Sequence, residues 1–160
     1  MGLPTVYVET SVISYLTSRP SRDLLIAARQ EATREWWDLR DTRFKPFVSK
    51  LVLQEASAGD PVAAYNRLRI CRSLPLLAIE EDCQSLADAL IAAKSVPATE
   101  QEDALHIALA TVSKVDFIAT WNFSHLVGPV IKFRLQTQIQ SMGFSPPILA
   151  TPEELLEMFA

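Results

Sequence analysis

Apolar side chains recur every three or four residues in one long stretch of the chain and gather in short runs elsewhere. Between residues 24 and 41 they mark one helical face, formed by Leu25, Ala28, Ala32, Trp36 and Leu39. This spacing follows the 3.6-residue period, so it predicts an amphipathic helix over 24–41. No segment repeats another, and no charge block or low-complexity stretch interrupts the pattern.

Short apolar runs bounded by polar or turn-forming residues are typical of strands. They lie at residues 6–8, 46–48, 76–79, 116–120 and 148–150. The run at 76–79 is Leu-Leu-Ala-Ile, apolar throughout, and it predicts a buried strand.

Helix-start signals fill most of the intervals between these runs. Ser49 and Asp60 each precede a helical pattern as an N-cap. Thr99, followed three residues later by Glu102, predicts a capping box for the next helix. Helices are therefore expected at residues 11–16, 24–41, 49–59, from 60 onward, 82–94, 100–113, 131–142 and from 151 onward.

Strands that alternate with helices predict an α/β fold, because parallel strands need the crossover connections that helices supply. Continuous apolar strands indicate a sheet that is covered on both faces. We therefore expect a three-layer α/β/α sandwich with a mostly parallel central sheet. The 160 residues suffice for one such unit, so residues 1–160 are expected to form a single domain.

The charge distribution adds an asymmetry to this picture. Hydrophobic residues make up 49% of the chain and charged residues 21%, as in ordinary globular proteins, and the net charge is −4. Residues 1–72 carry 11 Lys and Arg against 8 Asp and Glu, whereas residues 73–160 carry 4 against 11. An acidic chain does not hold nucleic acid by bulk electrostatics. A polyanionic partner should therefore meet the first half, or be bridged to the second half by metal ions.

Membrane and secretion signals are not found in the sequence. No window approaches the roughly 18 uninterrupted apolar residues of a membrane span, and the first residues lack the pattern of a secretory signal. Cys71 and Cys83 fit neither a disulfide framework nor a CxxC metal pair, so buried thiols in a reducing compartment are the simpler interpretation. We therefore expect a cytoplasmic protein with no membrane partner.

Isolated acidic residues fall at one edge of the predicted sheet. Glu9 directly follows the first strand, and Asn122 lies just beyond the fourth. Glu55 and Asp103 lie in the early turns of helices, whose N-termini share that edge with the carboxyl ends of the strands. These four oxygen-bearing side chains are therefore candidates for a common catalytic centre.

Apolar sequence surrounds the three carboxylates, Glu9, Glu55 and Asp103. Carboxylates in such surroundings repel one another and lose solvation, which raises their pKa unless a cation is bound. Hard oxygen ligands suit Mg²⁺ or Mn²⁺, and such a centre supports attack by metal-activated water on a phosphodiester. The three carboxylates are thus candidate metal ligands.

Structural roles account for each acid taken singly. An acid in the first turn stabilises a helix through the macrodipole, which is enough to explain Asp103. Glu9 can be a solvated turn residue, and Glu55 a surface residue. The layout alone leaves both interpretations open.

Four sequence fragments resemble the PIN-domain family, and the chain is similar to the VapC-type toxins of prokaryotic toxin–antitoxin pairs. The fragments are VYVETSVISYL, LVLQEASAGD, EDALHIALA and FIATWNFSHL. PIN domains open with a strand that ends in Asp-Thr/Ser-Ser, and here that slot reads ETS at residues 9–11. The family's second and third acids match Glu55 and Asp103, whereas its Thr-x-Asp element reads TWN at residues 120–122.

The resemblance implies a Mg²⁺- or Mn²⁺-dependent endoribonuclease that cuts RNA, is inhibited by a VapB-like antitoxin and pairs as a homodimer. It implies catalytic roles for Glu9, Glu55, Asp103 and Asn122, with the metal on the three carboxylates. The amide of Asn122 removes one negative charge, and Glu9 places its carboxylate one methylene further out than aspartate. One firmly bound metal is therefore expected rather than two. A catalytically weakened or inactive PIN-fold module that binds RNA or protein is the alternative.

Further residues near these acids are candidates for supporting roles. Thr10 and Ser11 can offer hydroxyls and a helix N-terminus to a metal-bound water or a phosphate, or can simply cap the helix. Thr120 can hydrogen-bond to Glu9 or Asn122, although a β-branched residue at a strand end is also expected for structural reasons alone. Arg19 and Arg22, in the break after the first helix, can contact RNA phosphates or remain solvated.

The two histidines and the other reaction classes add little to this picture. His106 lies one helical turn beyond Asp103, but the proposed chemistry does not need it, and a core role is the favoured interpretation. His125 is expected in a loop. The sequence lacks a Gly-rich phosphate loop and a DxDx[TV] nucleophile pair after the first strand, which disfavours phosphatases and nucleotide hydrolases. It also lacks a GxGxxG motif, which disfavours an NAD-binding domain.

Overall fold

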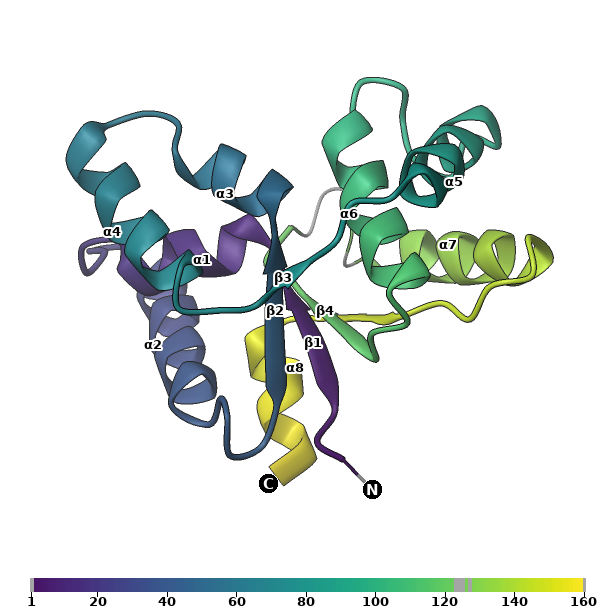
Figure 1. The fold of residues 1–160 in the computed structure, drawn as a ribbon. Helices are drawn as coiled ribbons and strands as arrows, with labels where there is room; N and C mark the ends of the chain where they lie inside the picture. The colour runs from purple at the N-terminus through teal and green to yellow at the C-terminus, as the bar shows by residue number, and fades with distance from the viewer. Residues whose placement is uncertain (1, 123–125, 127, 160) are drawn as a thin grey trace.

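Parallel strands form the centre of the protein in a computed structural model, which describes residues 2–122, 126 and 128–159 (Figure 1). Within these residues the sheet has five strands in the order β3-β2-β1-β4-β5, and every neighbouring pair is parallel. The strands are β1 (Thr5–Val8), β2 (Lys45–Ser49), β3 (Leu76–Leu77), β4 (Phe117–Ala119) and β5 (Ile148–Ala150). The predicted parallel sheet is confirmed.

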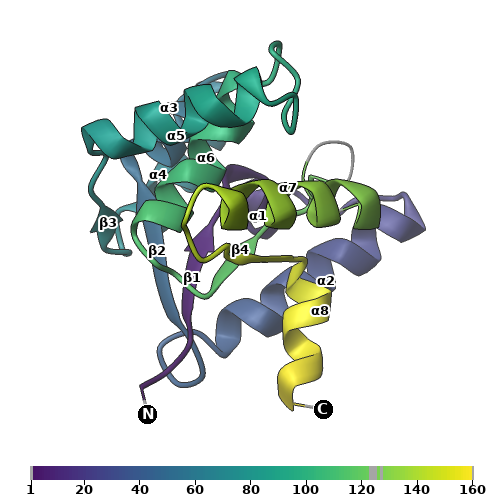
Figure 2. The same cartoon turned by 90° about the vertical axis from the view of Figure 1, so that its right-hand side faces the viewer.

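Two layers of helices enclose this sheet. The helices are α1 (Thr10–Thr17), α2 (Leu24–Asp38), α3 (Lys50–Ala56), α4 (Pro61–Cys71), α5 (Glu81–Ala92), α6 (Gln101–Val112), α7 (Pro129–Ser141) and α8 (Pro152–Leu156). Figure 1 shows α1 to α4 on one side of the sheet and α5 to α7 on the other, and Figure 2 faces the second group. The three-layer α/β/α prediction is therefore confirmed. In the described part of the chain, no helix has the length and apolar character that a bilayer crossing requires.

The strand order places a topological switch point beside β1. The chain passes from β1 to β2 and β3 in one direction across the sheet, and then to β4 and β5 on the other side of β1. In open α/β sheets, ligands bind beyond the carboxyl ends of the strands at such a point. The residues that follow β1 and β4 therefore occupy the position where a binding site is expected.

Local capping signals account for several of the helix boundaries. Ser49 accepts a hydrogen bond from the backbone N–H of Val52, and Asp60 accepts one from Ala63, as the sequence predicted. Thr151 opens α8 with a complete capping box. Both cysteines are buried and unpaired, which also agrees with the prediction.

Several local predictions are wrong, among them the helix expected over 49–59, which ends at Ala56. The strand expected at 76–79 is only two residues long, and Leu76 is 47% exposed because β3 is an edge strand that pairs with β2 alone. The helix expected over 24–41 ends at Asp38, and Asp41 adopts a left-handed conformation in the turn that follows. The capping box expected from Thr99 does not form, because α6 begins one residue later with Glu100 as its N-cap.

A buried glutamine fixes the loop between α1 and α2. The side-chain amide of Gln30 donates to the Ser18 hydroxyl at 3.0 Å and to the Arg19 carbonyl at 2.9 Å. Its oxygen accepts a hydrogen bond from the backbone N–H of Ser21 at 2.9 Å. One side chain on α2 therefore holds the loop that carries Arg19 and Arg22.

Gln30→Ala is expected to lower the free energy of unfolding by about 2 kcal/mol, because three hydrogen bonds to a buried amide are lost together. Urea denaturation measures the change, and trypsin should cleave after Arg22 faster than in the wild type. Gln140→Ala, at an exposed position of α7, is the matched control and should change the stability little. A loss no greater than that of the control would contradict the role assigned to Gln30.

Candidate active site

The predicted site residues come from both strands at the switch point and from two helices. Glu9 is the N-cap of α1 and follows β1 directly, and its backbone N–H donates to the Ala119 carbonyl at the end of β4 at 3.0 Å. Glu55 lies in the last turn of α3, and Asp103 in the first turn of α6. Asn122 follows β4. The acids thus lie around the carboxyl ends of the two strands, although Glu55, expected in an early turn of its helix, lies in the last turn because α3 ends at Ala56.

Glu9 is a buried carboxylate, with 6% of its surface exposed. Its Oε2 accepts hydrogen bonds from the Ser11 backbone N–H at 2.7 Å and from the Thr120 hydroxyl at 3.3 Å. Burial raises the pKa of Glu9 above its ordinary value, and the charge of Glu55 adds to this, while His106 and the Ser11 hydrogen bonds oppose it in part. Its placement rules out the solvated turn residue considered from the sequence.

Glu55 is held by a histidine and a threonine. His106 Nε2 lies 2.8 Å from Oε1, and the Thr10 hydroxyl donates to the same oxygen. Burial alone would raise the pKa of Glu55, but the hydrogen bond and charge of His106, together with Thr10, outweigh it and lower the pKa. The Glu55 side chain is 30% exposed and is therefore ionised beside solvent at neutral pH.

Asp103 and Asn122 form the third part of the site. Asp103 is 9% exposed, and the Asn122 side-chain amide lies 3.3 and 3.4 Å from its two carboxylate oxygens. The backbone N–H of Asn122 donates to the Thr120 hydroxyl at 3.0 Å, and that hydroxyl also contacts Glu9. Thr120, which is fully buried, thus connects Glu9 to the Asp103–Asn122 pair.

The supporting residues predicted from the sequence differ in what they do. Ser11 accepts a hydrogen bond from the Trp121 backbone N–H at 2.9 Å, and Thr10 contacts Glu55. Neither is the helix cap, because Glu9 occupies that position. Arg19 and Arg22 are exposed in the loop after α1. The eight residues of α1, about 12 Å of helix, separate that loop from the N-terminus of α1.

His106 has a role that the sequence interpretation did not find. It is 1% exposed, as expected for a core residue, but its ring joins Glu55 to the Tyr7 hydroxyl, which lies 2.6 Å from Nδ1. Tyr7 in turn contacts Ser49 at 2.8 Å. A tyrosine in an otherwise aliphatic buried strand was the available signal, because its hydroxyl needs a partner. His125 lies outside the described residues.

The ligand chemistry and the observed arrangement agree only in part with a metal site. Carboxylate oxygens are the ligands that Mg²⁺ and Mn²⁺ prefer, and Glu9 has the raised pKa expected of a buried acid without a cation. Within the described ranges, however, no three His, Cys, Asp or Glu side chains are close enough together to hold a metal ion as they stand. Direct coordination by all three carboxylates at once would therefore require them to move closer together, whereas Mg²⁺ is usually held by one or two carboxylates and several waters.

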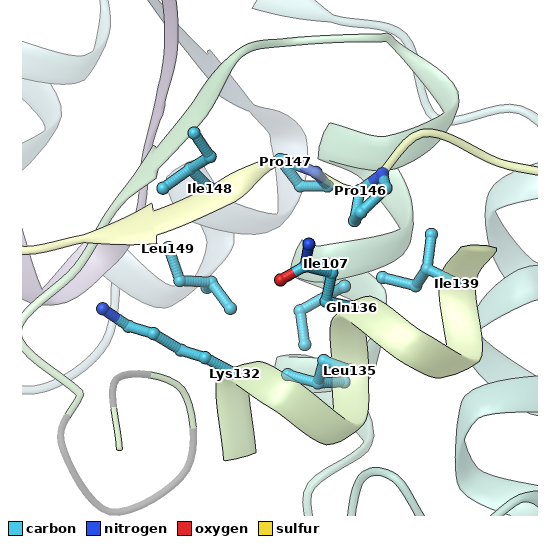
Figure 3. Close-up of a pocket in the computed structure, with 9 residues that line it drawn as sticks. All are labelled: Ile107, Lys132, Leu135, Gln136, Ile139, Pro146, Pro147, Ile148 and Leu149. Atoms are coloured by element: carbon cyan, nitrogen blue, oxygen red, sulfur yellow. The ribbon is translucent and has the colours of Figure 1, made fainter. Parts of the chain in front are cut away.

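A small cavity elsewhere in the molecule is separate from this site. It has a volume of about 100 Å³ and lies between α6, α7 and β5 (Figure 3). Its lining is mostly apolar and consists of Ile107, Lys132, Leu135, Gln136, Ile139, Pro146, Pro147, Ile148 and Leu149. None of the predicted site residues lines it, so it has no part in the proposed chemistry.

Glu9→Gln is expected to stabilise the metal-free protein at neutral pH. Because the folded-state pKa of Glu9 is raised, its contribution to stability is fully present at low pH and is lost as pH rises through that pKa. A neutral amide of similar shape avoids the loss, so the free energy of unfolding should rise by about 1 kcal/mol near pH 7. The gain should disappear below the ordinary glutamate pKa of 4.5.

Urea denaturation in the presence of EDTA, repeated at several pH values, measures this effect. Glu35→Gln, at an exposed position of α2, is the control and should show no such gain. A pH-independent difference between Glu9→Gln and the wild type would contradict a raised pKa for Glu9.

Comparison with known proteins supports the fold. No family model matches the chain, and no curated protein matches its sequence. Among solved structures, the chain is similar to VapBC2 from Rickettsia felis, crystallised bound to a DNA fragment from its promoter. The match covers 92% of this chain and 98% of that one, with 15% sequence identity and a TM-score of 0.60. The chain therefore shares its α/β fold with a chain of that VapBC2 structure.

Proposed function

We propose that this protein is a VapC-like, Mg²⁺- or Mn²⁺-dependent endoribonuclease, with residues 1–160 acting as one domain. The observation that carries the proposal is the position of Glu9, Glu55 and Asp103 around the carboxyl ends of β1 and β4. Two of the three are buried, and the charges of Glu9 and Glu55 act on each other. Three acids at a switch point form an anionic site suited to a divalent cation.

The proposed roles of the residues follow from their contacts. Glu9 and Glu55 each use one oxygen for protein hydrogen bonds, and no donor in the described part of the chain reaches Glu9 Oε1 or Glu55 Oε2. These oxygens, together with Asp103, would hold the cation. A bound cation would lower the pKa of a water molecule and so activate it to attack an RNA phosphodiester. Thr10, Ser11 and Thr120 keep the carboxylates oriented, and Arg19 and Arg22 offer exposed charges to RNA phosphates.

Asn122 favours one bound cation over two. Its amide takes the place of a fourth acid and donates toward both oxygens of Asp103. An amide oxygen carries no full negative charge. Fewer negative charges are therefore available near Asn122 to balance a second divalent cation.

Protein partners are part of the same proposal. The similar R. felis structure is a VapB–VapC complex, which supports a VapB-like antitoxin as a partner of this chain. Exposed apolar side chains at the start of α2 and on α4, including Leu24 (87% exposed), Val62 and Tyr65, offer surface for an antitoxin or for a homodimer.

A non-catalytic module that binds RNA or protein is the second candidate. Two observations favour it: Asn122 replaces an acid, and the acids do not form a ready three-ligand group among the described residues. Such a module would neither be stabilised by Mn²⁺ nor hydrolyse RNA.

Asp103→Asn is expected to abolish metal-dependent RNA cleavage. The purified wild type should cut single-stranded RNA with Mg²⁺ or Mn²⁺, and EDTA should stop it. Removing the Asp103 charge should lower the cleavage rate at least about a hundredfold. Asp82→Asn is the matched control, since Asp82 is also a first-turn acid, on α5, and lies exposed. Cleavage that survives in Asp103→Asn would remove Asp103 from the centre, and no cleavage or Mn²⁺ stabilisation in the wild type would favour the binding module.

Asn122→Asp is expected to strengthen Mn²⁺ binding. The added carboxylate beside Asp103 should lower the dissociation constant roughly tenfold, because cation affinity rises with ligand charge. Without metal, the same charge should lower the thermal midpoint through repulsion. Calorimetric titration and thermal denaturation with and without Mn²⁺ measure the two effects. Asn66→Asp, at an exposed position of α4, is the control, and equal affinities in the two variants would contradict a role for residue 122.

A further inference from the structure

A line of buried hydrogen bonds runs from the start of α3 through β1 and α6 to the candidate site. Ser49 Oγ accepts from the Val52 backbone N–H at 3.3 Å and lies 2.8 Å from the Tyr7 hydroxyl. Tyr7 lies 2.6 Å from His106 Nδ1, and His106 Nε2 lies 2.8 Å from Glu55 Oε1. Ser49 and Tyr7 are fully buried and His106 nearly so, and the line meets solvent only at Glu55.

The ionised state of Glu55 sets the direction of the last bond. An ionised carboxylate can only accept hydrogen bonds. His106 Nε2 must therefore be protonated and donate a hydrogen bond to Glu55 Oε1, whether the ring is neutral or charged. In the neutral ring, Nδ1 then accepts from the Tyr7 hydroxyl, and Tyr7 accepts from Ser49. Each buried hydroxyl in the line therefore has a partner.

Both protein donors reach the same oxygen of Glu55. His106 and Thr10 bond to Oε1, and no donor in the described residues reaches Oε2. The carboxylate is therefore held by one oxygen, with the other left for an external ligand. The donors come from opposite sides of the sheet, because Thr10 belongs to α1 and His106 to α6 (Figure 1).

We propose that His106, held in place by Tyr7 and Ser49, is a positioning residue that fixes Glu55 by Oε1 and directs Oε2 toward a divalent cation. The inference rests on the proposed metal-dependent function. It adds a role for three buried residues that lie outside the set of acids.

The buried polar side chains of Ser49, Tyr7 and His106 destabilise the fold relative to apolar side chains if they serve packing alone. Burying a hydroxyl or an imidazole carries a desolvation penalty that aliphatic side chains at the same positions avoid. Hydrogen-bond partners that orient a metal ligand strengthen metal binding, which offsets the desolvation penalty. Loss of such partners weakens metal affinity about 10- to 100-fold in other sites. The expected consequence of losing His106 is therefore weaker cation binding.

The test is calorimetric titration of the metal-free protein with Mn²⁺, using the wild type, His106→Leu, His106→Gln and Tyr7→Phe. His106→Leu removes the donor to Glu55 and should raise the Mn²⁺ dissociation constant about 10- to 100-fold. His106→Gln keeps an N–H donor and should restore the affinity to within a few-fold of the wild type. Tyr7→Phe leaves His106 without its partner and should weaken binding by a smaller factor.

Thr111→Val controls for damage to α6. Thr111 is buried in the same helix, and its hydroxyl donates to the Ile107 carbonyl of that helix at 2.7 Å. This variant should lose stability without a change in Mn²⁺ affinity. Nitrogen-15 NMR of histidine-labelled wild type gives a readout without metal or substitution, and it should show a proton on His106 Nε2.

Each result points one way. Weaker Mn²⁺ binding in His106→Leu, with recovery in His106→Gln, supports the proposal. If His106→Leu does not fold, the proposal is supported when Mn²⁺ affinity decreases in the order wild type, His106→Gln, Tyr7→Phe. Wild-type affinity in His106→Leu, or a bare Nε2 in the NMR spectrum, overturns the positioning role while leaving the nuclease proposal intact. A wild type that binds no Mn²⁺ overturns the metal-dependent function and the positioning role with it.

Discussion

Glu9 places a buried carboxylate, 6% exposed, at the point where β1 ends and α1 begins. An unpaired buried charge costs several kcal/mol, so the surroundings must compensate for it. The first turn of α1 donates a backbone N–H, Thr120 donates a hydroxyl from the end of β4, and His106 adds favourable electrostatics. Burial outweighs these contributions, so the pKa of Glu9 stays above its ordinary value. The proposed cation at this edge of the sheet would further stabilise the buried Glu9 charge.

The topology explains why these compensating groups come from distant parts of the chain. β1 lies between β2 and β4, so side chains that follow β1 meet residues after β4, about a hundred and ten positions later, such as Thr120. Side chains that point from β1 into the core meet α6, where His106 lies. Glu55 is held from both helical layers, through Thr10 and His106. The central strand therefore connects the two halves of the site.

The sequence predicted what depends on local patterns. Strand and helix positions followed from apolar runs and caps such as Ser49 and Asp60, since these signals lie within a few residues of the element they begin. The acids could be proposed as site residues because an isolated carboxylate in apolar sequence is conspicuous. The Tyr7–His106–Glu55 line was missed because its members are separated by 99 and 51 residues and no local pattern joins them. The exposure of β3 was missed because an apolar run does not reveal whether its strand lies at the edge of the sheet.

The two outer strands of the sheet limit how other chains can attach. β3 offers two residues and β5 three, and β5 is preceded by Pro146 and Pro147, which have no backbone N–H to donate. Short edge strands, one of them directly preceded by two prolines, are poor templates for adding a foreign strand, and they also protect against edge-to-edge aggregation. A partner protein must therefore engage helices or loops of this molecule instead of extending its sheet, and its contacts will be made by side chains more than by backbone.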